Sequence, residues 1–584
     1  MRAAALGLLL LVVGCDLTLE RSPAQSGRAV VPSFVETGPP TAPPEPRFQP
    51  MVYPPDADAP CAQAEAAPGI QPYRGSLRRI TAQDRTTVVF ELCDADVAFR
   101  TKVAAPSLVI NDTTWLESQI ATSDGDTPAI TRELNGTGPF RLDRWSGGTE
   151  IILSRFDEYR GRKAVPSALV FRWDSEPARR LEALRTGTVD GIDGVDADGV
   201  ATIEGNSEIR AQTREGLNVM YLGFNNRFAP FDRLEVRRAI ALGLDRQALL
   251  SAAFPPGATL ATHLTPCSVP YGCAGETWWE QDIPAARALL AETGFPDGFK
   301  TTIQYGVEPR DYLPEPEVLA IELKRQLEEN LGITAELEPM PFADLVKQAE
   351  EGKLDGIHLL GARARFPDAT AFLDPRLGSG ATPEFGDPFA DITGALAQGA
   401  HGASDDARRA AYTVANDSIR VRVPLIPLAH VGTVAGYRAD VTGFQVSPTN
   451  TEWFASVTPG DRAQFAWMGE AEPAGLYCPD ETTSEASRVC SQVFEGLYRY
   501  APGDTNPQSA LAKSCTPNDE FDIWTCTLQA DVRFHNGARL DANDVVLSYA
   551  IQWDASHPLH RGRTAEFQAF IDRFGGLLNA PASP

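Results

Sequence analysis

The chain contains near its end the stretch Asp531-Val532-Arg533-Phe534-His535-Asn536-Gly537-Ala538-Arg539-Leu540-Asp541-Ala542-Asn543-Asp544-Val545-Val546-Leu547-Ser548-Tyr549, on which the interpretation of the fold depends. Val532 and Phe534 alternate with charged or polar residues as in a strand, and Asn536-Gly537 predicts a tight turn. Asp541 predicts a helix N-cap, with Asp544 three residues later as in a capping box. The stretch predicts a strand, a turn and a capped helix, and none of these elements is a catalytic motif.

Length and charge set the broad class of protein. The 584 residues are enough for two or three domain-sized units, and a hydrophobic content of 43% is enough for packed cores. The formal net charge of −26 argues against a surface that binds nucleic acid or anionic lipid. We therefore expect a well-solvated acidic protein that binds no nucleic acid.

The first fifteen residues have the pattern of a signal peptide. Met1-Arg2 precedes an apolar run over residues 3–13, too short for a permanent membrane span. The run ends at Val12-Val13-Gly14-Cys15, which resembles a bacterial lipobox and implies that Cys15 is lipidated. The alternative is an ordinary secretory signal with a chance cysteine. Residues 16–60 follow, with eleven prolines between Pro23 and Pro60, and predict an extended tether.

The remaining cysteines favour an oxidising compartment. Leaving out Cys15, eight cysteines remain, an even number that suits disulfide bonds. Eight cysteines allow 105 pairings, so proximity in the sequence gives a suggestion only. It suggests the pairs Cys61–Cys93, Cys267–Cys273, Cys478–Cys490 and Cys515–Cys526. A zinc site is the weaker alternative, because no Cys-x-x-Cys is present and the histidines do not cluster; we expect no metal and no cofactor.

Helix and strand patterns alternate along the middle of the chain. Residues 86–92 form a β-rich run, and Asn135-Gly136-Thr137-Gly138-Pro139 predicts a sharp turn whose glycines adopt positive φ. That turn is not a phosphate loop, because the Lys-Ser/Thr is missing and a strand follows. Leucines at 319, 323, 327 and 331 form one helical stripe that ends at Gly332, and a strand pattern follows over 333–337. This alternation predicts α/β architecture.

Several of these segments resemble one family. The 531–549 stretch is similar to "D-V-x-F-x-D-G-x-P-L-T-A-x-D-V-V-x-S" of family 5 bacterial solute-binding proteins, the peptide- and nickel-binding components of ABC importers. Residues 136–142 resemble its "G-T-G-P-Y/F-x-L", and Tyr221–Asn226 with residues 230–240 resemble "Y-L-x-F-N … P-F-x-D-x-x-V-R-x-A-I". Residues 361–374 resemble "G-W-x-A-D-Y-x-D-P … F-L". The resemblance covers about residues 65–580.

The order of these segments departs from that of the family. In the family the segment like 531–549 lies near the mature N-terminus, whereas here it follows the segments that normally come last. Each segment appears once, so a tandem array is excluded, and a truncated second copy would leave the first copy without its opening. We interpret the order as a circular permutation, which costs little where native ends lie close together at the surface. The new junction would lie between Trp453 and Phe465.

The resemblance implies a particular fold class. It implies an α/β, two-lobed periplasmic-binding-protein fold with a hinge, family 5-type and circularly permuted, with lobe one discontinuous. Lobe one would comprise residues 61–234 and 431–584, and lobe two residues 235–430.

On the family template four segments would line a ligand pocket between the lobes. They are the 480–484 loop with Thr483 and Ser484, the 221–226 segment with Tyr221 and Asn225, the 558–560 turn with His560, and the 363–366 loop with Arg363, Arg365 and Phe366. For each the alternative is an ordinary surface loop.

One position departs from the family in a way that bears on the ligand. Peptide binders have an acid in "A-D-Y" that pairs with the ligand's α-ammonium, and Arg365 occupies that place here. A guanidinium is suited to carboxylate or phosphate. The substitution therefore predicts a ligand with an anionic group; the alternative is an unrelated surface arginine.

The sequence contains no Gly-x-Ser-x-Gly, His-Glu-x-x-His, Gly-x-Gly-x-x-Gly or P-loop in its required context, and an enzyme is disfavoured. The resemblance implies a monomeric solute-binding protein, lipid-anchored on the outer side of the cytoplasmic membrane, that delivers a small-molecule ligand to an ABC permease. The alternatives are a ligand sensor or envelope protein of the same fold, and an extracytoplasmic hydrolase.

Overall fold

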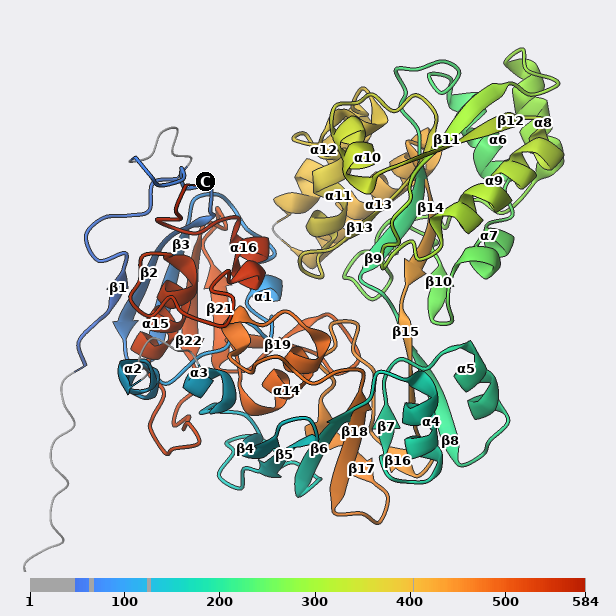
Figure 1. Ribbon diagram of the computed structural model, residues 1–584. Helices are drawn as coiled ribbons and strands as arrows, with labels where there is room; N and C mark the ends of the chain where they lie inside the picture. Colours follow the sequence, from blue (N-terminus) through green and yellow to red (C-terminus); the bar gives the residue numbers. More distant parts are fainter. Residues whose placement is uncertain (1–47, 62–67, 123–127, 403, 583–584) are drawn as a thin grey trace, which may run out of the picture. The chain divides into compact units, whose positions relative to one another are not determined.

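The computed structural model describes residues 48–61, 68–122, 128–402 and 404–582 (Figure 1). The predicted signal peptide with Cys15, and the tether up to residue 47, lie outside the described residues. Three main sheets organise the described part, with five, seven and six strands. None of the helices in that part combines the length and the apolar character needed to cross a membrane.

The five-stranded sheet combines segments from the two ends of the sequence. Its order is β1-β2-β3-β22-β21, from Val52–Tyr53, Leu77–Asp84, Thr87–Leu92, Ile523–Leu528 and Ala512–Pro517, and every pairing is antiparallel. β3 and β22 lie side by side, blue beside red in Figure 1, with Val88 opposite Cys526. Helix α15 (Ala542–Trp553) packs on this sheet, and the rings of Phe90 and Tyr549 are 5.0 Å apart. The two ends of the sequence therefore share one core.

The 531–549 stretch folds largely as its sequence predicts. Asp541 caps α15, and its side chain and that of Asp544 form the expected capping box. Gly537 has φ +89° in the predicted turn. The predicted strand is wrong: only an isolated bridge joins Arg533 to Arg539, because the turn follows so closely that each arm is too short for a ladder. The apolar side chains of that segment are nevertheless buried.

The seven-stranded sheet has the order β4-β5-β6-β18-β7-β15-β8. Its strands are Phe140–Ser146, Glu150–Arg155, Ala168–Trp173, Gln464–Gly469, Gly191–Ile192, Thr433–Arg438 and Ile209–Arg214. β18 runs parallel to both β6 and β7, whereas the outer pairings are antiparallel. Helices α4 (Pro177–Arg185), α5 (Ala197–Glu204) and α14 (Ser484–Val493) accompany this sheet.

The turn before β4 needs glycine for a reason other than the predicted one. Gly136 and Gly138 are absent from the positive-φ glycines among the described residues, so that expectation is wrong. A Cβ at Gly136 would overlap the carbonyl oxygen of Val493, and one at Gly138 would lie 2.5 Å from that of Gln492. Close approach to the end of α14 therefore requires the absence of a side chain.

The six-stranded sheet has the order β10-β14-β9-β13-β11-β12. Its strands are Ala258–Leu260, Leu425–Val431, Asn218–Gly223, Ile357–Arg363, Lys300–Gly306 and Thr334–Met340. Its helices are α6 (Leu234–Gly243), α7 (Arg246–Ala253), α8 (Ile283–Glu292), α9 (Pro316–Leu331), α10 (Phe342–Glu350), α11 (Ala369–Leu377), α12 (Ala390–Ala400) and α13 (Asp405–Arg422). The leucine stripe on α9 is buried and Gly332 caps that helix at φ +67°, as predicted.

The chain passes between the seven- and six-stranded sheets at two places. Residues 215–217 connect β8 to β9, and Gly432 connects β14 to β15. β9 pairs on both sides within the six-stranded sheet, so we propose that the lobe boundary lies at 215–217 instead of at residue 234. We use lobe two for residues 218–431, and lobe one for the described residues before 215 and after 432. Lobe two has a continuous core of its own.

Order begins earlier in the predicted tether than the sequence suggests. Residues 48–60 are already part of the fold: β1 pairs with β2, and Phe48, Met51 and Tyr53 pack on the core of the five-stranded sheet. The hydroxyl of Tyr53 also donates to Asp554 at 2.5 Å. The expectation that order starts near Cys61 is therefore wrong, because three large apolar side chains in this segment have a core to bury against.

The remaining short elements are α1 (Phe99–Lys102), α2 (Thr113–Thr122), α3 (Pro128–Arg132), α16 (Gln568–Phe574), β16 (Val441–Thr442), β17 (Thr458–Pro459), β19 (Tyr498–Tyr500), β20 (Pro507–Ser509) and three 3-10 turns at Pro383–Phe385, Phe454–Ser456 and Cys478–Asp480. Four disulfides join the pairs that sequence proximity suggested: Cys61–Cys93, Cys267–Cys273, Cys478–Cys490 and Cys515–Cys526.

Candidate functional site

A cavity of about 740 Å³ lies against one end of the lobe-two sheet. Side chains from β9, β13, α11 and the 383–385 turn line it. The lobe-two lining includes Tyr221, Tyr312, Arg363, Arg365, Phe366, Asp374, Arg376 and Glu384, and the lobe-one lining includes Arg74, Asp94, Asp96, Lys102 and Arg573. Its size suits a small organic ligand, and its many charged groups predict a polar one.

A hydrogen-bonded network of buried side chains forms part of the lobe-two wall. The hydroxyl of Tyr221 donates to Oε1 of Glu384 at 2.8 Å and accepts from Nε of Arg376 at 3.3 Å. Nε2 of His358 lies 3.3 Å from the same Glu384 oxygen. Neighbouring strands position the two rings, because Tyr221 on β9 is opposite Leu360 on β13, and His358 precedes it by two residues on the same strand. Side chains from β9 and β13 thus converge on the Glu384 carboxylate, and Arg376 joins them through the Tyr221 hydroxyl.

Burial and charge set the ionisation of this network. Burial pushes the pKa of Glu384 upward, but the hydrogen bond and charge of His358, with Arg376, outweigh it and leave that pKa below its usual value. Burial raises the pKa of Tyr221 well above 10, and the charge of Glu384 adds to the effect. Burial disfavours the Arg376 cation, but Tyr221 and Glu384 raise its pKa overall. The wall therefore holds a carboxylate and a guanidinium, both charged at neutral pH.

Asp374 is the one lobe-two lining carboxyl with a strongly raised pKa among the described residues. Burial, and then the negative charge of Asp368, raise its pKa to about 7. Its Oδ1 is buried and accepts no hydrogen bond within the described part of the chain. The carboxylate of Asp368 already has partners, because it caps α11 and pairs with Arg408 at 2.8 Å. Asp374 is thus a carboxyl group in the cavity wall that changes its charge near neutral pH.

The three residues predicted from the 363–366 loop line the cavity. Arg363 forms an exposed ion pair with Asp311. Arg365 is exposed, and no carboxylate among the described residues forms an ion pair with it. The ring of Phe366 lies 4.8 Å from the ammonium nitrogen of Lys102. Arg365 is therefore available to an anionic group of a ligand.

Other predicted residues have structural roles away from the cavity. Asn225 is fully buried, and its Nδ2 donates to the carbonyl of Gly352 at 3.0 Å. Thr483 caps α14, and Ser484 is the first residue of that helix. Nδ1 of His560 lies 2.6 Å from the carbonyl oxygen of Ile551. The structure therefore brings Tyr221 together with the 363–366 loop, and it does not bring Asn225, Thr483, Ser484 or His560 to this cavity.

Sequence reasoning missed Asp374, Arg376, Glu384 and His358. The sequence contains a weak signal for two of them, because charged residues flank Pro375 within an otherwise apolar helix. No pattern in the neighbouring sequence predicts Glu384 as a cavity residue, since it lies in a 3-10 turn far along the chain from Tyr221. Asn226 holds the chain just after that turn. Its side-chain amide donates to the carbonyl of Asp387 and accepts from the N–H of Asp387, at 2.8 Å each.

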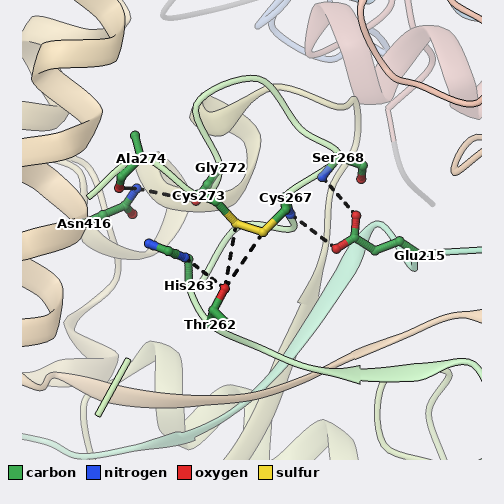
Figure 2. The surroundings of a disulfide bond; sticks show 9 residues. All are labelled: Glu215, Thr262, His263, Cys267, Ser268, Gly272, Cys273, Ala274 and Asn416. Carbon is green, nitrogen blue, oxygen red and sulfur yellow. Dashed lines mark hydrogen bonds between the residues drawn. A yellow bond between two sulfur atoms is a disulfide. The ribbon is translucent and has the colours of Figure 1, made fainter. Parts of the chain in front are cut away.

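A second cluster includes one histidine and two cysteines. Ligand atoms of His263, Cys267 and Cys273 lie within 4.8 Å of one another. The two sulfur atoms are bonded to each other, as Figure 2 shows, so neither is a thiolate that could bind a metal ion. In this state the cluster is a disulfide beside a buried histidine.

The sequence is similar to a known family of bacterial proteins. A family model described as "Bacterial extracellular solute-binding proteins, family 5 Middle" matches residues 50–384. The chain is 24% identical over 400 residues to di/tripeptide-binding protein 1 of Pseudomonas aeruginosa, covering 66% of this chain and 72% of that protein. It is 27% identical over 384 residues to the glutathione-binding protein GsiB of Shigella dysenteriae, covering 64% and 72%.

A solved structure shares the fold. HbpA2 from Haemophilus parasuis matches with a TM-score of 0.59 and 26% identity, and the match covers 66% of this chain and 76% of that one. Curated relatives also include heme-binding protein A of Haemophilus influenzae, 26% identical over 394 residues, covering 65% of this chain and 70% of that protein. The names of these relatives include several chemically different ligands.

Proposed function

Because the chain belongs to family 5 of the bacterial extracellular solute-binding proteins, we propose that it binds a small molecule in the 740 Å³ cavity and delivers it to the permease of an ABC importer. The family consists of binding proteins and not of enzymes. The relatives named for di/tripeptides and glutathione support a polar, peptide-sized solute. On this proposal the protein acts as a monomer outside the cytoplasm.

The observation that carries the choice of ligand class is the exposed guanidinium of Arg365 in the cavity lining. Arg365 is exposed at the cavity without an ion-pair partner among the described residues, whereas the neighbouring Arg363 pairs with Asp311. A planar guanidinium favours a carboxylate or phosphate. Tyr221 and Phe366 contribute aromatic surface to the same cavity. We propose that the ligand presents an anionic group to Arg365.

Native mass spectrometry of the purified protein tests this proposal. We expect a bound species that dissociates on collisional activation and carries a carboxylate or phosphate. Loss of a charged hydrogen-bonding partner costs about 2–5 kcal/mol of binding, so Arg365→Ala should weaken affinity for that compound more than tenfold. Arg162→Ala, a change at an exposed arginine outside the cavity lining, is the matched control. Tight binding of a cationic compound that ignores Arg365→Ala would contradict the proposed ligand class.

We propose that Cys15 is lipidated and holds the protein at the outer side of the cytoplasmic membrane. The support is the Val12-Val13-Gly14-Cys15 sequence alone, since these residues lie outside the described part. Cys15→Ser should move the protein from the membrane fraction to the soluble extracytoplasmic fraction. Unchanged membrane association of this variant would show that another element provides the anchor.

A ligand sensor of the same fold is the second candidate, because binding in the cavity is common to both roles. Uptake of the labelled ligand by cells that lack this protein separates the two. Lost uptake, restored by the intact chain, supports transport. Normal uptake in cells that lack the protein supports the sensor.

A further inference from the structure

The two segments that cross between the lobes touch each other along the backbone. A Cβ at Gly216 would overlap the carbonyl oxygen of Val431, and one at Gly432 would overlap that of Arg214. The side-chain amide of Asn218 also exchanges two hydrogen bonds of 2.8 Å with the backbone of Val431. Any change in the angle between the two lobes must be absorbed by these paired segments.

Glu215, in the first crossing segment, is held by a loop of lobe two. Its two carboxylate oxygens accept the backbone N–H groups of Cys267 at 3.3 Å and Ser268 at 2.9 Å, as Figure 2 shows. Consecutive backbone N–H groups provide a good site for one carboxylate. The Cys267–Cys273 disulfide closes this loop, which we name the clamp loop (residues 267–273).

The clamp loop is compact. The N–H of Val269 donates to the carbonyl of Pro266 at 3.1 Å, and that of Gly272 to Val269 at 2.9 Å, so two turns follow in succession. Gly272 lies so close to Pro266 that a Cβ there would overlap its carbonyl oxygen. A cross-link between nearby residues restricts the other conformations that such a loop could adopt. The disulfide therefore keeps the two N–H groups aimed at Glu215.

The other side of the clamp loop is fixed to α13. The ring of Tyr271 stacks on Tyr412 with centroids 5.8 Å apart, and its hydroxyl donates to Asp405 at 2.9 Å. Nδ2 of Asn416 donates to the carbonyl of Ala274, directly after the loop, at 2.9 Å. The loop is thus attached to the crossing segment at one end and to a long helix of lobe two at the other.

A further contact leads from this attachment to the cavity wall. The guanidinium carbon of Arg408 on α13 lies 5.0 Å from the centre of the Tyr271 ring. Arg408 also pairs with Asp368, which caps α11, and α11 contains the lining residues Asp374 and Arg376.

We propose that the clamp loop stiffens the hinge: its disulfide presents two backbone N–H groups to Glu215 and so ties the crossing segment to the lobe-two helices. This role does not depend on the identity of the ligand or on transport. Releasing the loop should let the crossing segments open locally more often and should leave the cores of both lobes unchanged.

Hydrogen exchange of the ligand-free protein tests this proposal. Two backbone amides report on the crossings: Val431, which donates to Asn218, and Ala364, which donates to the carbonyl of Leu217 at 3.1 Å. Hydrogen bonds to charged groups are among the stronger ones, so we expect about tenfold faster exchange at both amides in Glu215→Gln and in the double variant Cys267→Ser/Cys273→Ser. Amides of α9 and α15 should exchange at the wild-type rate.

Glu280→Gln is the control, because Glu280 is an exposed acid of lobe two near the same loop and should change neither reporter amide. Faster exchange confined to the clamp loop itself, with Val431 and Ala364 unchanged in both variants, would overturn the proposal. If the double variant does not fold, Glu215→Gln alone decides, since it keeps the disulfide and the side-chain volume.

Discussion

The backbone N–H of Asn536 donates to Oδ1 of Asn135 at 3.1 Å, although the two residues are 401 positions apart in the chain. The side-chain amide of Asn536 donates to Asp112 at 2.7 Å, and so does that of Asn135 at 3.0 Å. The Asn536-Gly537 turn and the turn that precedes β4 are therefore joined through one shared carboxylate.

We propose that the chain is a circular permutation of the family order. Two observations support this: β3 pairs with β22, and residues 580–582 pair with 69–71. The N–H of Gln71 donates to the carbonyl of Ala580 at 2.8 Å, and that of Ala582 to Gly69 at 2.9 Å. In the family order these adjacent segments would be joined directly.

The first prediction is that restoring the family order preserves the fold. A rearranged chain would start at Asp461, run to residue 582, continue through a short Gly-Ser linker to residue 69, and stop at Gly460. The reference is residues 69–582 in their original order, because both chains then lack β1 and the Cys61–Cys93 disulfide. We expect the rearranged chain to match the urea unfolding midpoint and slope of that reference, since the linker spans ends that are already hydrogen-bonded.

The control for that prediction uses the same linker and opens the chain between Leu547 and Ser548 instead. This cut interrupts α15, nearly all of whose side chains are buried, and should prevent cooperative folding. An unfolded family-order chain beside a folded original would show that the present order is required, and would contradict the permutation.

The sequence predicted those features of the fold that depend on residues close together in the chain. Asp541 and Asp544 specify a helix start through side-chain and backbone hydrogen bonds three residues apart, and Gly332 specifies a helix end through its positive φ. Tyr221 and Arg365 were placed at the cavity by resemblance to family motifs, and the cavity includes both. Motif order also assigned β3 and α15 to the same lobe, and in the structure they share one core.

Contacts between distant segments could not be predicted in this way. Glu384 and His358 have no common local pattern, and only the register of β9 against β13 brings His358 near Tyr221. The family template predicted Asn225 in the ligand pocket, but tertiary packing buries it, and its amide donates to the carbonyl of Gly352. Gly136 must be glycine because the backbone of Val493 lies against it. Nothing in residues 135–142 predicts that Val493 is its neighbour.

The second prediction concerns a buried ring of charges in lobe one. Arg214 pairs with Asp193 at 2.7 Å and with Glu452 at 2.6 Å, and Arg488 pairs with the same two acids at 2.5 and 2.7 Å. The Glu452 side chain has no exposed surface. Glu452→Gln should lower the free energy of unfolding by about 3–5 kcal/mol, because the two buried guanidinium groups then share only the Asp193 carboxylate. Urea denaturation measures this change.

Glu329→Gln is the comparison for the ring. Glu329 pairs with Arg325 on α9, but its side chain is 60% exposed, so water replaces the lost partner. We expect its unfolding midpoint to match that of the original chain. Equal midpoints for the Glu452 and Glu329 variants would show that the ring does not stabilise lobe one.

The third prediction concerns His535, which lies in the 531–549 stretch. Burial, opposed by a hydrogen bond to Gly138, lowers its pKa to about 4 from an ordinary 6.5. The native state therefore keeps the ring neutral, while the unfolded chain takes up a proton below pH 6.5. Its contribution to stability is fully present above pH 6.5 and falls as the pH drops toward 4, by roughly 3 kcal/mol over the full interval.

His535→Gln isolates this contribution. The stability difference between the original chain and the variant, measured by urea denaturation at several pH values, should shrink as the pH falls from 7 to 4.5. A difference that stays constant over that range would mean that His535 does not change its charge on unfolding.

The fourth prediction concerns Asp374 and the charge of the ligand. Its pKa of about 7 lies above the ordinary 3.8, so the native state holds this proton over a range in which the unfolded chain has lost it. The resulting stability is fully present below pH 3.8 and is lost as the pH rises through 7. The same rise adds a negative charge to the cavity wall, so an anionic ligand should bind more weakly at pH 8 than at pH 5.5. Asp374→Asn should remove both dependences.

Calorimetric titration with the co-purified compound, or with glutathione as an anionic probe, measures the binding part of this prediction, and urea denaturation of the free protein measures the stability part. The binding measurement and the unfolding measurement can contradict the prediction independently of each other. If Asp374→Asn flattens the pH dependence of unfolding but leaves that of binding unchanged, Asp374 titrates near neutrality and the anionic group binds elsewhere than beside it. If binding strengthens as the pH rises, a cationic group of the ligand faces Asp374, because the carboxylate formed above pH 7 then attracts it, and the expected repulsion of an anion by Asp374 is wrong.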